Sequence, residues 1–263
     1  MRFITAVVIV LVGELTASAA LAQSPDIDEL MRRVAMYVQS FVDTFRDVVA
    51  DERYDQQIGS RRRQLASDFL LVGYPGRTDR LLTFRDIRQV DGQPVKDQTD
   101  RITQLFLKPF DSAVGRATEI QMEGLRHTLP GGRLVNPLTV LTLLQREYQK
   151  EYRFTRQGLD PTLGSGIRRI DLIRLRPPLN SQPRGSVWVS ETTGEVVRTL
   201  WRITGSERTT TTFEVDRALR IRVPVRMEDE VGNFRGSATY SNFRRFNVRT
   251  ESTIDESNSK TPR

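Results

Sequence analysis

The sequence contains no cysteine and a single histidine, His127. The absence of cysteine excludes disulfides, thiol nucleophiles and a lipidated N-terminal cysteine. His127 has no acidic residue at ligand spacing, so it indicates neither a metal site nor a Ser-His-Asp triad. We therefore expect no catalytic residue, no cofactor and no metal site, and we do not expect an enzyme.

No apolar run is long enough to cross a membrane, and the longest one lies at the N-terminus. Arg2 precedes an apolar stretch over residues 3–12, and small residues follow up to Ala22. This pattern is typical of a secretory signal peptide. The stretch is too short to span a bilayer, and Glu14 interrupts its continuation. We predict cleavage after Ala22 and export to the periplasm as a soluble protein.

The chain then divides into a signal peptide over residues 1–22, a single domain over 23–250 and a disordered tail over 251–263. The tail is polar and has no apolar periodicity. The formal net charge is +7, and loss of the leader leaves it unchanged because the leader holds one arginine and one glutamate. A basic exported protein meets anionic lipid headgroups or polysaccharide, so we expect no nucleic-acid partner.

Three regions have the apolar spacing of amphipathic helices. The first carries one apolar stripe from Ile27 to Val49. The second spans about residues 98–128 and is interrupted at Pro109, because proline breaks the hydrogen-bond ladder. The third begins at Asn136, a capping residue followed by proline. These helices need an apolar surface to lie on.

Strand-forming residues dominate the remaining sequence. Gln64–Val72 and Leu81–Val90 form an early pair of predicted strands, and Asp91-Gly92 marks a tight hairpin. From Tyr152 onward, short turns separate consecutive strand-like segments, which predicts an antiparallel meander. The alternation from Leu219 to Met227 predicts that one face of its strand is apolar and the other carries arginine.

Four segments resemble known exported bacterial proteins: RLVNPLTVLTLLQ (133–145), VWVSETTGEVVRT (187–199), IRVPVRMED (221–229) and GSATYSNFRRFNV (236–248). Together with the order of elements, they are similar to the periplasmic lipoprotein-carrier family of LolA and LolB. The resemblance implies an α+β fold, with a curved antiparallel sheet, an open half-barrel, and amphipathic helices that cover its concave face. In the soluble carriers an arginine on an early strand helps to latch the helical lid. Arg61, Arg62, Arg63, Arg85 and Arg88 lie in the corresponding region, and no motif selects one of them.

The resemblance and the strand patterns together indicate an apolar cavity. Alternation places Tyr240 and Phe246 on one face of their strand and Phe243 on the other. The candidate cavity residues are Phe69, Leu71, Trp188, Trp201, Ile221, Val223, Tyr240 and Phe246.

Two functions follow as hypotheses. In the first, the protein is a non-catalytic periplasmic carrier whose partner is a hydrophobic ligand, such as a lipid or a lipoprotein acyl chain, with transient contact to the envelope membrane or a lipoprotein. In the alternative, its helices fill the cavity, and it is a cell-envelope interaction module that binds protein or glycan. A filled core and a ligand cavity have similar sequences, so both hypotheses stay open at this point.

Overall fold

The computed structural model describes residues 26–46, 48–73, 81–95, 110–177, 183–203 and 205–245. The strands are β1 (Val48–Ile58), β2 (Arg61–Gly73), β3 (Leu81–Val90), β4 (Gln93–Pro94), β5 (Tyr152–Leu159), β6 (Ile167–Arg174), β7 (Arg184–Ser190), β8 (Val196–Arg202), β9 (Glu207–Asp216), β10 (Ile221–Val231) and β11 (Phe234–Arg245). The helices are α1 (Ile27–Thr44), α3 (Phe110–Arg126), α4 (Thr139–Leu143) and α5 (Arg146–Gln149), with a 3₁₀ turn at Pro161–Leu163.

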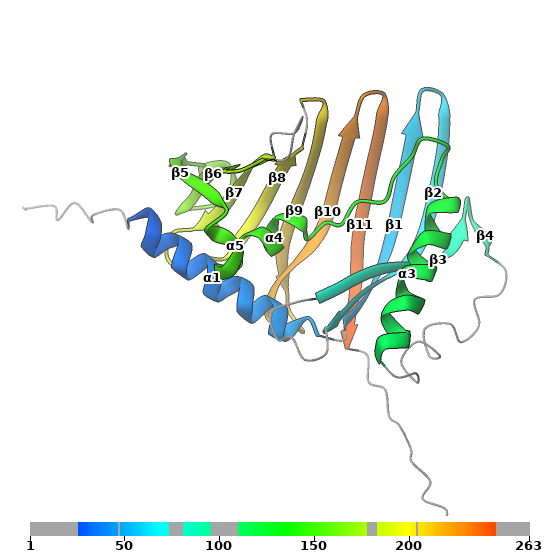
Figure 1. Ribbon diagram of the computed structural model, residues 1–263, viewed down its shortest axis with the longest axis horizontal. Coiled ribbons are helices and arrows are strands. Elements are labelled where there is room, and N and C mark those ends of the chain that lie inside the picture. Colours follow the sequence, from blue (N-terminus) through cyan, green and yellow to red (C-terminus); the bar gives the residue numbers. More distant parts are fainter. Residues whose placement is uncertain are drawn as a thin grey trace, which may run out of the picture.

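All strands belong to one antiparallel sheet with the order β4-β3-β2-β1-β11-β10-β9-β8-β7-β6-β5. Strands β5 to β11 form the predicted meander. Strand β1 then pairs with β11, so the N-terminal strands extend the sheet beyond the last strand. The α+β fold class and the open antiparallel sheet are therefore confirmed. Figure 1 shows α1 running across one end of the curved sheet, while the chain between α3 and α4 crosses in front of the strands.

Helix α1 follows the predicted stripe but ends earlier than expected. It stops at Thr44, and Val48 and Val49 already belong to β1. Strand β1 was not predicted, because the buried Glu52 and Gln56 occupy positions where a strand ordinarily places apolar residues.

The helix predicted from Asn136 consists of two short helices, α4 and α5, separated by Leu144 and Gln145. The predicted hairpin at Asp91-Gly92 is confirmed, since both residues have positive φ, as a type I′ turn requires. Of the second helical region, α3 is described from Phe110 on, and the predicted break at Pro109 lies outside the described residues.

The main core lies between the sheet and α1. Leu30, Val34, Val38 and Phe41 of α1 are all buried against the sheet, and Leu141 of α4 joins them. Burial of each such side chain contributes about 1.5–3 kcal/mol. Within the described residues, no helix is both long and apolar enough to cross a membrane.

Candidate functional site

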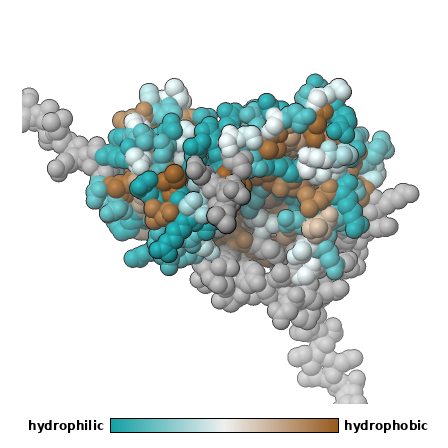
Figure 2. Space-filling view, turned by 45° about the horizontal axis from the view of Figure 1, so that its top comes forward, coloured by the Kyte–Doolittle hydropathy of each residue, from teal (hydrophilic) through white to brown (hydrophobic). Residues whose placement is uncertain are grey.

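One row of side chains crosses the sheet beneath the helices. Strand pairing places its members opposite one another from β6 to β2: Ile170, Val187, Thr199, Thr211, Met227, Ala238, Tyr54 and Leu65. All are buried. We call the face that carries this row the inner face and the opposite one the outer face. In Figure 2 apolar side chains reach the surface in separate patches among hydrophilic ones, in keeping with a covered apolar face.

A groove opens beside this face, between α1 and the β5 edge of the sheet. Its volume is about 640 Å³, within the range of small-molecule sites. Met31 and Ala35 line it from α1, and Tyr152 and Phe154 line it from β5. The Tyr152 ring meets the Trp201 ring edge-on at 6.2 Å between centroids, so the groove adjoins the inner face.

The segment of residues 127–138, which we call the strap, joins α3 to α4 and is held to the inner face by polar contacts. The deepest involves Arg85 on β3. Its Nε donates to Glu52 Oε2 at 2.6 Å, and its Nη2 donates to the carbonyl of Val135 at 2.6 Å. Burial alone would lower the pKa of the Arg85 guanidinium, but the Glu52 carboxylate outweighs this effect and raises that pKa, so Arg85 stays charged.

Strands β1 and β2 supply further contacts to the strap. Arg63 Nη1 donates to the carbonyls of His127 and Thr128 at 3.0 and 3.3 Å. The buried Gln56 amide donates to the Arg133 carbonyl at 3.1 Å and accepts from the Leu129 N–H at 3.0 Å. Side chains of the sheet thus bind the strap backbone at several points along its length.

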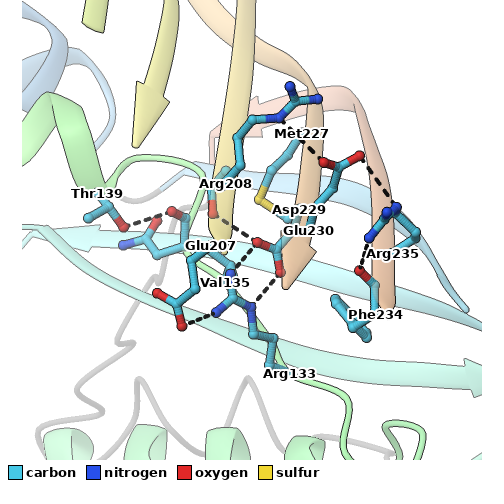
Figure 3. Close-up of polar contacts among 12 residues, drawn as sticks. Arg133, Val135, Thr139, Glu207, Arg208, Met227, Asp229, Glu230, Phe234 and Arg235 are labelled. Atoms are coloured by element: carbon cyan, nitrogen blue, oxygen red, sulfur yellow. Dashed lines mark hydrogen bonds and ion pairs between the residues drawn. The ribbon is translucent and has the colours of Figure 1, made fainter. Parts of the chain in front are cut away.

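Arg133 makes the reverse contact, from the strap to the sheet. Its Nε donates to Asp229 Oδ2 at 2.6 Å, a second nitrogen binds the other carboxylate oxygen, and Nη1 pairs with Glu207 at 3.2 Å. Thr209 Oγ1 also donates to Asp229, at 2.8 Å. Figure 3 shows this fork of Arg133 on Asp229, an arrangement in which both partners are charged and the bonds are strong.

Most of the predicted cavity residues lie in or against the core on the inner side. Phe69, Leu71, Val223 and Tyr240 are buried, while Trp201 and Ile221 are partly buried and pack against the same core. The centroids of the Phe69 and Tyr240 rings are 5.4 Å apart, and the guanidinium carbon of Arg85 lies 5.2 Å from the centroid of the Phe69 ring. Phe246 lies outside the described residues.

Trp188 corrects the prediction, because it lies on the outer face. Its indole nitrogen donates to Asp160 at 3.0 Å, and Arg169 stacks on its ring at 5.7 Å. Trp188 alternates with Val187 and Val189, which are buried, so the regular geometry of β7 turns it outward. The partner strand β8 carries a β-bulge, because Trp188 pairs with Arg198 but Val189 pairs with Val196. The extra residue reverses the alternation of β8 relative to β7 and places Trp201 on the face opposite to Trp188.

Phe243 is a second correction. Alternation predicted it on the face opposite to Tyr240, yet its ring meets Phe45 edge-on at 6.1 Å within the core on the inner side. Asn242 has a positive φ, and the pairing of β11 with β1 shifts register at this point. The break in regular strand geometry turns Phe243 inward.

Two of the five early-strand arginines contact the strap, and no sequence pattern separated these two from the others. Arg61 and Arg62 are exposed, whereas Arg85 and Arg63 contact the strap. Arg88 pairs instead with Asp51 and Asp68 at 3.4 and 3.5 Å. Among the described residues, no group of three histidine, cysteine, aspartate or glutamate side chains is placed to hold a metal ion.

No model of a known protein family and no curated protein matches the sequence. Among solved structures, an outer membrane lipoprotein-sorting protein domain from Vibrio parahaemolyticus is 10% identical, with a TM-score of 0.46 over 86% of this chain and 96% of that chain. A LolA superfamily protein from Nitrosomonas europaea is 11% identical, with a TM-score of 0.36 over 82% and 94%. A DUF1329 family protein from Desulfovibrio piger is 13% identical, with a TM-score of 0.42 over 88% and 98%.

Proposed function

We propose that the protein is a non-catalytic carrier that binds an acyl chain, from a lipid or a lipoprotein, between the inner face of the sheet and its cover of α1 and the strap. The observation that carries this proposal is the pairing of a continuous, largely apolar row with a strap that is attached to the sheet by polar contacts.

The free energy that the strap hydrogen bonds contribute is comparable to the free energy gained by burying an acyl chain. A hydrogen bond to a charged group contributes about 1.5–3 kcal/mol to stability. Burial of each methylene is worth about 0.8 kcal/mol, so a chain of about twelve carbons supplies roughly 10 kcal/mol. Such a ligand offsets the loss of several latches, among them those of Arg85 and Arg63 to strap carbonyls.

The groove between α1 and β5 is the proposed entrance. Met31, Ala35 and Phe154 give it apolar walls, and the exposed Arg146 stands beside it. An acyl chain that enters here reaches Trp201 after passing Tyr152. The arginine offers a partner for a carboxylate or phosphate headgroup.

The proposal includes export. Residues 1–22 act as a signal peptide, and the carrier works in the periplasm after cleavage. The intact mass of the protein from the envelope fraction should correspond to a chain that begins at Gln23. A membrane-retained species that keeps Met1 would contradict this part of the proposal.

Fluorescence of Trp201 tests ligand binding. Trp188→Phe leaves Trp201 as the single tryptophan, and it lies on the inner side. Titration with a medium-chain fatty acid below its micelle concentration should shift the emission saturably. Binding should also speed hydrogen exchange in the strap, because the latches must open.

Two substitutions on one helix provide the matched control. Ala35→Phe fills the groove, whereas Ser40→Phe adds the same side chain at an exposed position outside it. The first should weaken binding at least tenfold, and the second should leave it unchanged. Equal binding by both variants would place the ligand elsewhere.

The alternative function, an envelope interaction module, is favoured by one specific observation. Leu30, Val34 and Phe41 of α1 already occupy the inner side, so the cavity is filled in this structure. If the Trp201 emission stays constant at saturating fatty acid, and the protein purified from the envelope carries no lipid by native mass spectrometry, the interaction module replaces the carrier.

A further inference from the structure

We infer that the outer face of strands β5 to β8 is a docking surface for an anionic phospholipid bilayer. The surface is defined by two rows of directly paired residues. One row is Arg153, Ile173, Arg184 and Arg202, and the other is Arg169, Trp188 and Arg198. This inference uses the face opposite to the proposed ligand site and does not depend on a ligand being bound.

The first row brings like charges together. Arg184 of β7 lies directly opposite Arg202 of β8, and like charges at such positions are destabilising. In the part of the chain that the structure describes, no acidic side chain pairs with Arg153, Arg184 or Arg202. A repulsive arrangement without local compensation indicates that an external anion completes it.

The acidic side chains nearby are already engaged. Asp171, in the row between the two arginine rows, accepts from Arg169 at 2.8 Å and from Ser186 at 2.6 Å. Asp160 accepts from the Trp188 indole. The net character of this face is therefore positive. A depression of about 590 Å³ lies among these residues, lined by Arg153, Arg184 and Arg202 together with Trp188.

Exposed aliphatic residues at one end of the surface favour a bilayer over another polyanion. Ile173 and Leu175 are 36% and 53% exposed. Leu175 directly follows β6 and lies two residues beyond Ile173, so alternation places both side chains on the outer side at the same end of β6. Arginine, tryptophan and aliphatic side chains together suit the headgroup region of a membrane, where charge and apolar surface are both satisfied.

Vesicle sedimentation tests this surface. The purified protein should sediment with vesicles made of equal parts phosphatidylglycerol and phosphatidylcholine, but not with phosphatidylcholine alone. The triple variant Arg153→Gln, Arg184→Gln, Arg202→Gln should partition on the order of a hundredfold more weakly at low salt, because each arginine near an anionic surface contributes severalfold.

The matched control removes the same charge elsewhere. Arg61, Arg126 and Arg217 are exposed and lie outside the two rows, and their triple exchange to glutamine should change partitioning only a few-fold. In a Trp201→Phe background, Trp188 is the single tryptophan, and its emission should respond to anionic vesicles. Because Trp201 reports the inner side and Trp188 the outer face, failure of this inference and failure of the carrier proposal give different signals.

Three results would overturn the inference. One is absence of binding to the anionic vesicles, and the second is an equal loss in the two triple variants. The third is binding to heparin that depends on the same three arginines while vesicles do not bind, since this would identify a soluble polyanion as the partner.

Discussion

Because Gly236 has no side chain, the hydroxyl end of Tyr54 can pack directly against it on the inner face. A Cβ atom at position 236 would lie 2.5 Å from Tyr54 Oη, and the ring itself is fully buried. Burial raises the pKa of the Tyr54 hydroxyl, which keeps it neutral near Asp229. The two residues come from β1 and β11, so this contact fixes how the N-terminal strands join the meander.

Gly236→Ala should therefore destabilise the protein by about 1–3 kcal/mol, because the methyl group forces the Tyr54 ring to move in a close-packed core. The measurement is the free energy of unfolding in urea. Gly158→Ala is the control, since a Cβ at that position meets nothing within 4 Å. Equal stabilities of the two variants would contradict the close packing of Tyr54.

Gly194, in the turn between β7 and β8, is predicted to allow the close approach of α1, because its missing side chain leaves room for the α1 backbone. It has a φ of +75°, and a Cβ there would lie 2.5 Å from the backbone carbon of Arg33. Gly59 has a similar φ of +59° with nothing within 4 Å. Gly59→Ala should cost about 1–2 kcal/mol from backbone strain alone. Gly194→Ala should lower stability clearly more than Gly59→Ala does, because α1 must also shift. Thermal unfolding of both variants measures the difference.

Removing one member of the Arg85–Glu52 pair is predicted to destabilise the protein far more than replacing both members with apolar residues. Loss of one partner leaves a buried charge, so Arg85→Met should destabilise the protein by about 3–5 kcal/mol. The double variant Arg85→Met, Glu52→Leu should recover most of that stability. Urea unfolding of both variants checks this, and a double variant as unstable as the single one would show that the strap contact to Val135 dominates.

Stability is expected to fall in acid partly through Glu191, which bridges Arg156 and Arg168. Burial alone would raise the pKa of the Glu191 carboxyl, but the hydrogen bonds from both arginines outweigh it and hold this pKa below its ordinary value. A lowered folded-state pKa stabilises the fold above the unfolded value near 4.5, and this contribution is lost as pH falls through the folded value.

Glu191→Gln should thus cost about 1 kcal/mol at pH 7. It should also flatten the decline of the unfolding free energy as the pH is lowered from near neutral into the acid range below 4.5. Urea titrations across this range measure both effects. A variant whose stability declines as steeply as that of the parent would falsify the role of the Glu191 bridge.

Much of the fold was predictable because local patterns matched the final environment. The apolar stripe of α1 matches the residues it buries, and the strands of the meander from Tyr152 onward occur where strand composition and turns predicted them. Strand β1 escaped prediction because Glu52 and Gln56 are polar residues on an inner face. Their burial is tolerable only because Arg85 and the strap, which are distant in sequence, satisfy them.

Apart from β1, the sequence by itself determined the kinds of element and their order, since helix and strand periodicity are properties of neighbouring residues. The tertiary structure decided which arginines latch the strap and which tryptophan lies inside. Arg61, Arg62, Arg63, Arg85 and Arg88 are chemically equivalent, and only their places in the sheet distinguish them. A single extra residue in β8 separates Trp188 from Trp201, because the face of every later side chain depends on the register at that bulge.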